Sequence, residues 1–248
     1  MKKSITALLA ILLAGICVSV SAGQIASLSV INQTTGERLT IWRHRGNNYV
    51  AGNPGDRYAV EIKNKTGGRI LSVVSVDGIN VLNGETASVS QSGYVLGAQQ
   101  SFEVKGWRKS MDEVAAFYFT QLPDSYAART ARPDNVGVIG IAVFQEYSEP
   151  VAVEDQSANR MAAAPIAGSR AKSAESIADT KLGTGHGERV ASVVHTAEFR
   201  RASEQPSEII SIQYDTYAHL VARGVIPRSD YRLPVPRAFP GSFVPDPS

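Results

Sequence analysis

Three short apolar runs, separated by turn residues, make residues 55–85 the most constraining stretch of the sequence. In the first run, residues 57–63 alternate between apolar and polar or small side chains, which is the two-residue period of a strand with one buried face. The second run, residues 70–76, is rich in β-branched side chains and ends at Asp77-Gly78. That pair accepts the positive φ angles of a two-residue type I′ turn, and Asn83-Gly84 follows the third run in the same way. The stretch therefore predicts antiparallel strands joined by tight turns.

Strand patterns recur along the rest of the chain at the spacing of a β-sandwich. We expect further strands at residues 25–31, 38–44, 94–96, 101–107, 115–120, 136–146 and 208–214, and a strand or hairpin arm at 189–199. The polar, glycine-containing residues 45–55 predict a loop. A capping-box pattern predicts a helical turn at 110–113, and short helices are expected at 125–129 and 216–223, the latter ending at Gly224. The expected fold class is mainly β, an antiparallel sandwich-like domain with a small strand-helix extension at the C-terminal end.

Composition divides the chain into five parts. Residues 1–22 have the character of a signal peptide, and residues 23–148 hold the sandwich-like domain. Residues 149–180 are rich in Ala and Ser and lack aromatic side chains, which is typical of a flexible linker. Strand and helix patterns return in residues 181–226, which we expect to complete the sheet. Residues 227–248 contain six of the twelve prolines and predict an extended tail that docks either on its own sheet or on a partner.

The N-terminal residues carry an export signal. They combine Lys2 and Lys3, an apolar stretch over residues 5–20, and small side chains up to Ala22. This is the pattern of a secretory signal peptide, and cleavage is expected after Ala22. Cys17 raises the alternative of a lipid-anchored protein, but Ile16 occupies a position where such proteins need Gly or Ala; an uncleaved anchor is the other alternative. We therefore expect a bacterial protein that is periplasmic or secreted.

Removal of residues 1–22 changes what the chain can bind. It removes the only cysteine, so the rest of the chain has no thiol nucleophile, thiolate metal ligand or disulfide. It also removes two of the 25 basic residues, leaving 23 against 23 acidic residues. A chain near zero net charge without a Lys/Arg run lacks the electrostatic signature of a nucleic-acid-binding protein. The longest later apolar run, residues 136–144, is too short to span a bilayer, so no membrane span is expected after cleavage.

The best candidate for a chemical site is the glycine-rich stretch 182–195, LGTGHGERVASVVH. Two imidazoles and one carboxylate, at His186, Glu188 and His195, are sufficient for a zinc-type site or for a general base with an orienting partner. Their spacing matches no known metal motif, and a single straight strand would place His186 and His195 on opposite faces. The competing interpretation is a glycine-rich turn that re-enters the sheet. A metal-dependent hydrolase using this Gly-His-Gly loop is therefore the alternative function.

Aromatic residues offer a second candidate site. Trp42 and Trp107, with Tyr94, are candidates for a ligand-binding platform, since flat rings stack on sugars and peptides. The competing interpretation places these rings in the core, where most aromatic side chains of sandwiches lie. His219 is isolated in the sequence and is interpreted as a packed or surface residue. Neither a Gly-x-Gly-x-x-Gly cradle nor a Gly-x-Ser-x-Gly elbow occurs, so the sequence implies no cofactor and no serine catalysis.

Several stretches resemble a group of uncharacterised secreted proteins of Gram-negative bacteria. These stretches are YAVEIKNKTGGRILSVVSVDGINVLNGETA, QSGYVL, GWRKS, DSYAART, VGVIGIAVF and LGTGHGER, and the resemblance runs through most of the chain after residue 22. It implies a periplasmic or envelope setting but no activity and no functional residue. We therefore expect a non-enzymatic binding or structural protein of the cell envelope, whose partner is an envelope protein or a glycan. The sequence carries no signal for an oligomeric state.

Overall fold

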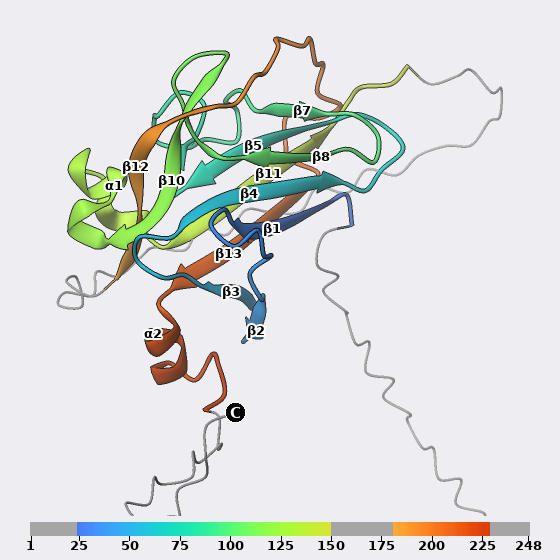
Figure 1. Ribbon diagram of the computed structural model, residues 1–248. Coiled ribbons are helices and arrows are strands. Elements are labelled where there is room, and N and C mark those ends of the chain that lie inside the picture. The colour runs from blue at the N-terminus through green and yellow to red at the C-terminus, as the bar shows by residue number, and fades with distance from the viewer. Residues whose placement is uncertain (1–23, 150–180, 229–248) are drawn as a thin grey trace, which may run out of the picture.

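The computed structural model describes residues 24–149 and 181–228, which form two facing β-sheets (Figure 1). The expected signal peptide lies outside the described residues, as do all but the first residue of the expected linker and all but the first two of the expected tail. The described chain is mainly β, as the strand patterns predicted. Its two sheets pack their apolar faces together in a sandwich-like arrangement.

The first sheet, which we call sheet A, has six strands. Its main path runs in the order β1–β4–β10–β12, with β8 beside β4 and β9 beside β10. All of its pairings are antiparallel. Its strands are β1 (Ala26–Asn32), β4 (Arg57–Asn64), β8 (Ser101–Val104), β9 (Gly106–Arg108), β10 (Glu113–Gln121) and β12 (Leu182–Ala191).

The second sheet, sheet B, has seven strands in the order β2–β3–β13–β11–β5–β6, with β7 beside β5. They are β2 (Trp42–His44), β3 (Asn47–Ala51), β5 (Ile70–Val76), β6 (Ile79–Asn80), β7 (Tyr94–Leu96), β11 (Val138–Gln145) and β13 (Glu208–Asp215). Only the β3–β13 pairing is parallel among the described strands. Because β13 lies between β3 and β11, residues 181–226 supply strands to both sheets and an interior strand to sheet B.

The core between the sheets draws on both parts of the chain. Tyr58 and Phe119 of sheet A stack with ring centroids 4.3 Å apart, and Tyr214 of β13 packs against both rings. Ile139 and Ile212 on the facing strands of sheet B are almost fully buried in the same cluster. Burying each such side chain stabilises the fold by about 1.5–3 kcal/mol. The N- and C-terminal parts therefore share one core.

The turn predicted at Asp77-Gly78 is confirmed. Val76 pairs with Ile79 across the β5–β6 hairpin, and the two turn residues have φ angles of 52° and 74°. A Cβ atom added at Gly78 would lie 2.7 Å from Cβ of Asn135. Gly78 therefore suits this turn for two reasons. It accepts the positive φ angle, and its lack of a side chain leaves room for the neighbouring loop at Asn135.

Three local predictions are wrong. Residues 45–55 are not simply a loop, because Arg45 (φ 47°) and Gly46 (φ 79°) form a tight turn that lets β3 pair with β2. Residues 110–113 form no helix: Ser110 Oγ accepts the backbone N–H groups of residues 112 and 113, and β10 then begins at once. The strand expected at 189–199 ends at Ala191, although the next residues still bond to the loop before β10 through the backbone N–H groups of 192 and 194.

The short helices follow their capping residues. Helix α1 (Tyr126–Arg129) begins after Ser125, whose hydroxyl accepts the backbone N–H of Ala128. Helix α2 (Tyr217–Ala222) begins after Thr216 in the same way and is followed by Gly224 with φ 71°. Two 3₁₀ turns, η1 (Leu122–Asp124) and η2 (Pro133–Asn135), complete the connections. Both helices lie where Ser or Thr satisfies free N–H groups of the first turn.

The glycine-rich stretch is a strand, not a loop. Residues 182–191 form β12, which pairs with β10 along its whole length apart from one irregularity near Ala116. A Cβ atom at Gly185 would lie 2.1 Å from Cζ of Tyr118, and one at Gly183 would lie 2.6 Å from Cβ of Ser125. These glycines therefore provide space for neighbouring side chains. The close packing of Tyr118 and Ser125 against β12 therefore explains the glycine-rich sequence better than a flexible loop does.

Candidate functional site

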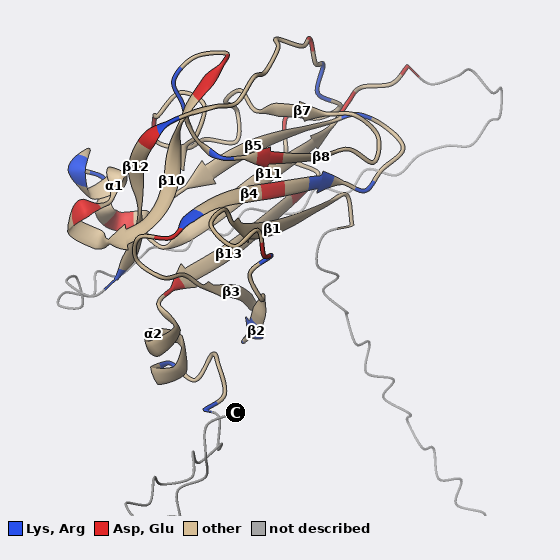
Figure 2. Cartoon of the chain, in the orientation of Figure 1, with Lys and Arg blue, Asp and Glu red and all other residues tan. Residues whose placement is uncertain are grey.

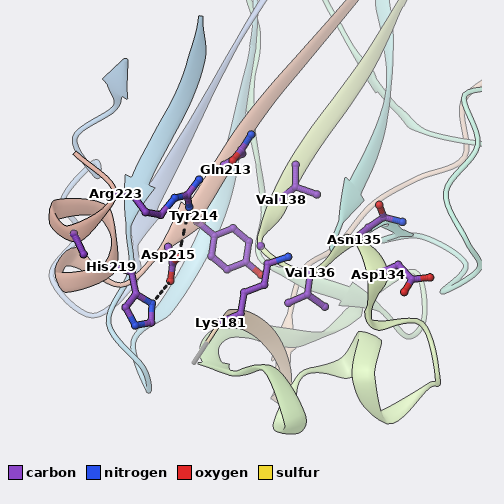
Figure 3. A pocket seen from close by; sticks show the side chains of 12 residues that line it. Asp134, Asn135, Val136, Val138, Lys181, Gln213, Tyr214, Asp215, His219 and Arg223 are labelled. Carbon is purple, nitrogen blue, oxygen red and sulfur yellow. Dashed lines mark hydrogen bonds and ion pairs between the residues drawn. The ribbon is translucent and has the colours of Figure 1, made fainter. Parts of the chain in front are cut away.

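A cavity of about 610 Å³ lies where the ends of β11 and β13 meet helix α2. Figure 3 shows its side chains, which come from three separate parts of the chain. The first part is residues 134–138 around η2 and the start of β11, and the second is Lys181 just before β12. The third part contains residues 213–215 at the end of β13 together with His219, Ala222 and Arg223 in and after α2. The interior position of β13 thus brings helix α2 beside the start of β11.

Asp215 forms one wall of the cavity and is already well supplied with donors. Its Oδ1 atom lies 2.9 Å from Nδ1 of His219 and accepts the backbone N–H of Thr216 at 2.8 Å. Its Oδ2 atom lies 3.7 Å from Nη1 of Arg223, and the carboxylate side chain is only 10% exposed. A carboxylate oxygen accepts hydrogen bonds, so Nδ1 of His219 is the donor in this contact.

Lys181 forms the opposite wall. Its side chain is half-buried, and no described residue forms an ion pair with its ammonium group. The side chain passes over Gly137, where an added Cβ atom would lie 3.2 Å from Cε of Lys181 and 3.3 Å from the carbonyl oxygen of Tyr214. The absence of a side chain at Gly137 therefore helps to keep this wall open.

Several charged residues of sheet A form ion pairs with each other. In Figure 2, basic and acidic residues are interspersed along sheet A and the loops beside it. Arg57 lies 2.7 Å from Glu188, and Arg189 lies 2.8 Å from Glu113. Such exposed pairs contribute little to stability. The ammonium of Lys181 differs because it lines a cavity without a described counter-ion.

Behind the cavity wall lies a buried polar cluster centred on Asp77. Its Oδ1 atom accepts the Tyr214 hydroxyl at 2.6 Å and the backbone N–H of Gly137 at 2.9 Å. Its Oδ2 atom accepts the backbone N–H of Thr184 at 2.9 Å. The carboxylate thus joins the β5–β6 turn to the starts of β11 and β12 and to the end of β13. Tyr214 and Gly137 belong to both this cluster and the cavity lining.

The hydroxyl groups of the cluster form a chain with one direction. Tyr214 donates to Asp77, so its oxygen accepts from Thr184 Oγ1 at 2.7 Å. Thr184 has one hydroxyl proton, so it accepts in turn from the Tyr58 hydroxyl at 2.5 Å. The hydroxyls of Tyr214, Thr184 and Tyr58 therefore each have a partner inside the core, where an unpaired polar group would be costly.

Burial dominates the acid–base behaviour of the cluster. Desolvation raises the pKa of Asp77 to about 6, although its hydrogen bonds with the Tyr214 hydroxyl and the backbone N–H groups of Gly137 and Thr184 act in the opposite direction. Burial also raises the pKa of Tyr58 and Tyr214 well above the ordinary value, with the charge of Asp77 as the next cause. Both tyrosines therefore remain protonated donors at neutral pH.

The two tryptophans of the expected platform are not brought together. Trp107 is 3% exposed in the core, where its Nε1–H donates to the carbonyl oxygen of Gly185 at 3.1 Å. Trp42 is half-buried on sheet B and packs against a separate cluster that contains Tyr49 and Leu220. Tyr94 is also buried. The core interpretation therefore describes Trp107 and Tyr94, and only Trp42 keeps a partly accessible face.

The three residues of the expected metal site do not converge. His186 is half-buried in β12 with its ring 5.7 Å from that of Tyr126, and burial, followed by the charge of Lys109, lowers its pKa. Glu188 is exposed and engaged with Arg57, while His195 is exposed beyond the end of β12. Among residues 24–149 and 181–228, no three His, Cys, Asp or Glu residues gather in a way that could hold a metal ion.

Sequence reasoning missed the residues that the fold does bring together. The sequence predicted Asp77 as a turn residue, but no sequence pattern predicted that its carboxylate is buried. Asp215 and His219 carried a local signal, since a four-residue separation at a helix start allows contact, yet His219 was interpreted as isolated. Lys181 carried no signal that distinguishes it from any other lysine next to a strand.

Comparisons of the chain with protein-family models, curated proteins and solved structures found no match. Within the part of the chain that the structure describes, no helix is long and apolar enough to cross a membrane. The fold therefore defines the chain as a mainly β, two-sheet protein, and an argument about function depends on the cavity. Its lining combines charged, amide and apolar side chains.

Proposed function

We propose that this chain is a periplasmic or secreted binding protein of the bacterial cell envelope, without catalytic activity, that holds a small molecule in the cavity beside α2. One observation carries the proposal: a cavity of about 610 Å³ lined by both apolar and charged side chains. Ligand sites of proteins commonly have volumes of about 300–1,000 Å³ and combine an apolar lining with a few polar groups.

The lining provides the two kinds of contact that a small organic ligand needs. Val136, Val138 and the ring of Tyr214 offer apolar surface, while Asn135 and Gln213 offer amide groups that both donate and accept hydrogen bonds. The Asp77 cluster holds Tyr214 and Gly137 in place from behind. Because these lining groups are fixed before a ligand arrives, binding costs less ordering of side chains.

A matched pair of variants on α2 tests the proposal. Ala222 and Ala218 are both exposed residues of α2, but only Ala222 lines the cavity. We expect native mass spectrometry of the protein purified from its own periplasm to detect a co-purifying small molecule. Ala222→Trp should lose that mass because the indole fills the cavity, whereas Ala218→Trp should retain it.

Three results would contradict this proposal. The first is a bound molecule that survives Ala222→Trp, which would place the ligand elsewhere. The second is a bound metal ion that disappears on His186→Ala, which would favour the metal-dependent hydrolase instead. The third is a protein that carries no added mass and takes up no small molecule in solution, which would show that the cavity is not a ligand-binding site.

The cellular location is tested separately. The leader pattern of residues 1–22 supports export, and N-terminal sequencing of the protein from fractionated cells should give Gly23 as the first residue of a periplasmic or extracellular product. Recovery of a chain that still begins at Met1, or a lipid modification at Cys17, would replace the exported soluble form with a membrane-anchored one.

A further inference from the structure

The charged groups around the cavity are used unequally. Asp215 accepts from His219 and from one backbone N–H and forms an ion pair with Arg223, so its negative charge has a positive partner within the protein. Asp134 is exposed to solvent at the rim, where water screens its charge. Lys181 is half-buried in the lining, and no described residue provides it with a counter-ion. The half-buried charge of the cavity that has no described counter-ion is therefore positive.

Arg223 adds a second source of donors. Its guanidinium lies 5.4 Å from the ring centre of Tyr49, and its contact with Asp215 is long at 3.7 Å. A guanidinium has five N–H donors, so one long contact leaves most of them available. Figure 3 shows Arg223 and Lys181 reaching the cavity from different parts of the chain, with the ring of Tyr214 between them.

We infer that the ligand carries an anionic oxygen group, a carboxylate or a phosphate, that binds the ammonium of Lys181, while its apolar part lies against Val136 and Val138. This inference rests on the proposed function and specifies its ligand class. A charge-assisted hydrogen bond to an ammonium is short and about twice as strong as a neutral one. A cationic ligand fits less well, because it would compete with His219 and Arg223 for Asp215.

The inference can be tested with probes that share one apolar chain and differ in charge. Octanoate and octyl phosphate carry anionic oxygen groups, whereas octanamide is neutral and octylammonium is cationic. Calorimetric titration of the mature protein near neutral pH should give tighter binding for one or both anions than for the amide, and the weakest binding for the ammonium. The preferred anion would distinguish a carboxylate ligand from a phosphate ligand.

Variants at Lys181 then assign the preference to one side chain. We expect Lys181→Gln to weaken binding of the preferred anion by at least about tenfold, equivalent to about 1.4 kcal/mol, with little effect on octanamide. Lys181→Arg should keep most of the preference because it keeps the charge. Lys63→Gln is the matched control, since Lys63 lies on β4 and does not line the cavity.

The outcomes separate this inference from the proposed function. Equal affinity for the four probes, or preference for octylammonium, would overturn the anionic ligand while leaving a binding cavity in place. Anion binding that Lys181→Gln and Lys63→Gln weaken equally would also overturn it. If none of the probes binds, the inference is wrong, and the α2 variants with the co-purifying molecule still decide whether the cavity is a binding site.

Discussion

The two polar regions on either side of Tyr214 differ in how completely their hydrogen-bonding groups are used. Behind the ring, Asp77 accepts the Tyr214 hydroxyl and two backbone N–H groups, and the hydroxyls of Thr184 and Tyr58 continue the chain. In front of it, the ammonium of Lys181 lines an open cavity. The first region uses its polar groups to hold five chain segments together, whereas the second leaves the ammonium of Lys181 available.

This difference indicates which region serves stability and which serves binding. A buried network is favourable only when all of its members are paired, and removing one member leaves others unpaired in a dry environment. A group that faces a cavity already contacts solvent, so its removal costs the fold little. Substitutions behind Tyr214 should therefore reduce the free energy of unfolding, and substitutions in front of it should reduce affinity.

The largest loss of stability is expected for Asp77→Ala. The change deprives the Tyr214 hydroxyl and the N–H groups of Gly137 and Thr184 of their acceptor, at about 1–3 kcal/mol for each unpaired buried group. Urea denaturation should show a free energy of unfolding lower by at least about 3 kcal/mol. Asp134→Ala, which removes an exposed carboxylate, is the control and should change it by less than about 0.5 kcal/mol. Equal effects would show that Asp77 is no more than a turn residue.

The second prediction concerns the pH dependence of Asp77. Its pKa rises from 3.8 to about 6 on folding, so the folded state holds the proton more strongly. Its stabilising contribution is therefore fully present below pH 3.8 and is lost as the pH rises through about 6. The loss amounts to about 3 kcal/mol at most, because each tenfold difference in proton affinity between the two states corresponds to about 1.4 kcal/mol.

Asp77→Asn isolates this effect because its amide does not titrate. The free energy of unfolding of the wild type minus that of the variant should fall between pH 4 and pH 7. Other carboxylates titrate alike in both proteins and cancel in the difference. A difference that stays constant or rises with pH would mean that the Asp77 carboxylate is not destabilised by burial.

The contrast also explains how far the sequence could lead. The Asp77-Gly78 turn and the short helices expected at 125–129 and 216–223 depend on residues close together in the chain, and the structure confirms the turn and both helices. The partners of Asp77 lie 60, 107 and 137 residues away in the chain. No local pattern encodes such contacts, so the turn could be predicted and its burial could not.

The glycines of β12 are a case in which the local sequence pattern predicted the wrong structure, because contacts distant in sequence determine it. Locally, three glycines around His186 favour a loop, because glycine weakens an isolated strand. In the fold, Gly185 lies against the ring of Tyr118 on the neighbouring strand, where a side chain would not fit. The long pairing with β10 then determines the conformation. The cavity was hidden for a related reason, because its walls come from three distant segments.

A smaller loss of stability is expected when the hydroxyl chain is cut. Thr184→Val keeps the shape of the side chain but leaves the Tyr58 hydroxyl without its acceptor, which should cost about 1–3 kcal/mol. Tyr58→Phe removes only the terminal donor and should cost about 0.5–1.5 kcal/mol. The order of the two losses in urea denaturation tests the direction of the chain. A larger loss for Tyr58→Phe would mean that the hydroxyl protons are arranged differently.

The smallest effect on the fold is expected at the cavity. Lys181→Gln removes a charge without a described partner, so the free energy of unfolding without ligand should change by less than about 0.5 kcal/mol. With the preferred anion present, octanoate or octyl phosphate, the wild type and Lys63→Gln should melt at a higher temperature, because a ligand that binds only the folded state stabilises it. Lys181→Gln should lose most of that increase. A Lys181 variant that is destabilised without ligand as strongly as Thr184→Val would place Lys181 among the structural residues, and the two sides of Tyr214 would no longer differ.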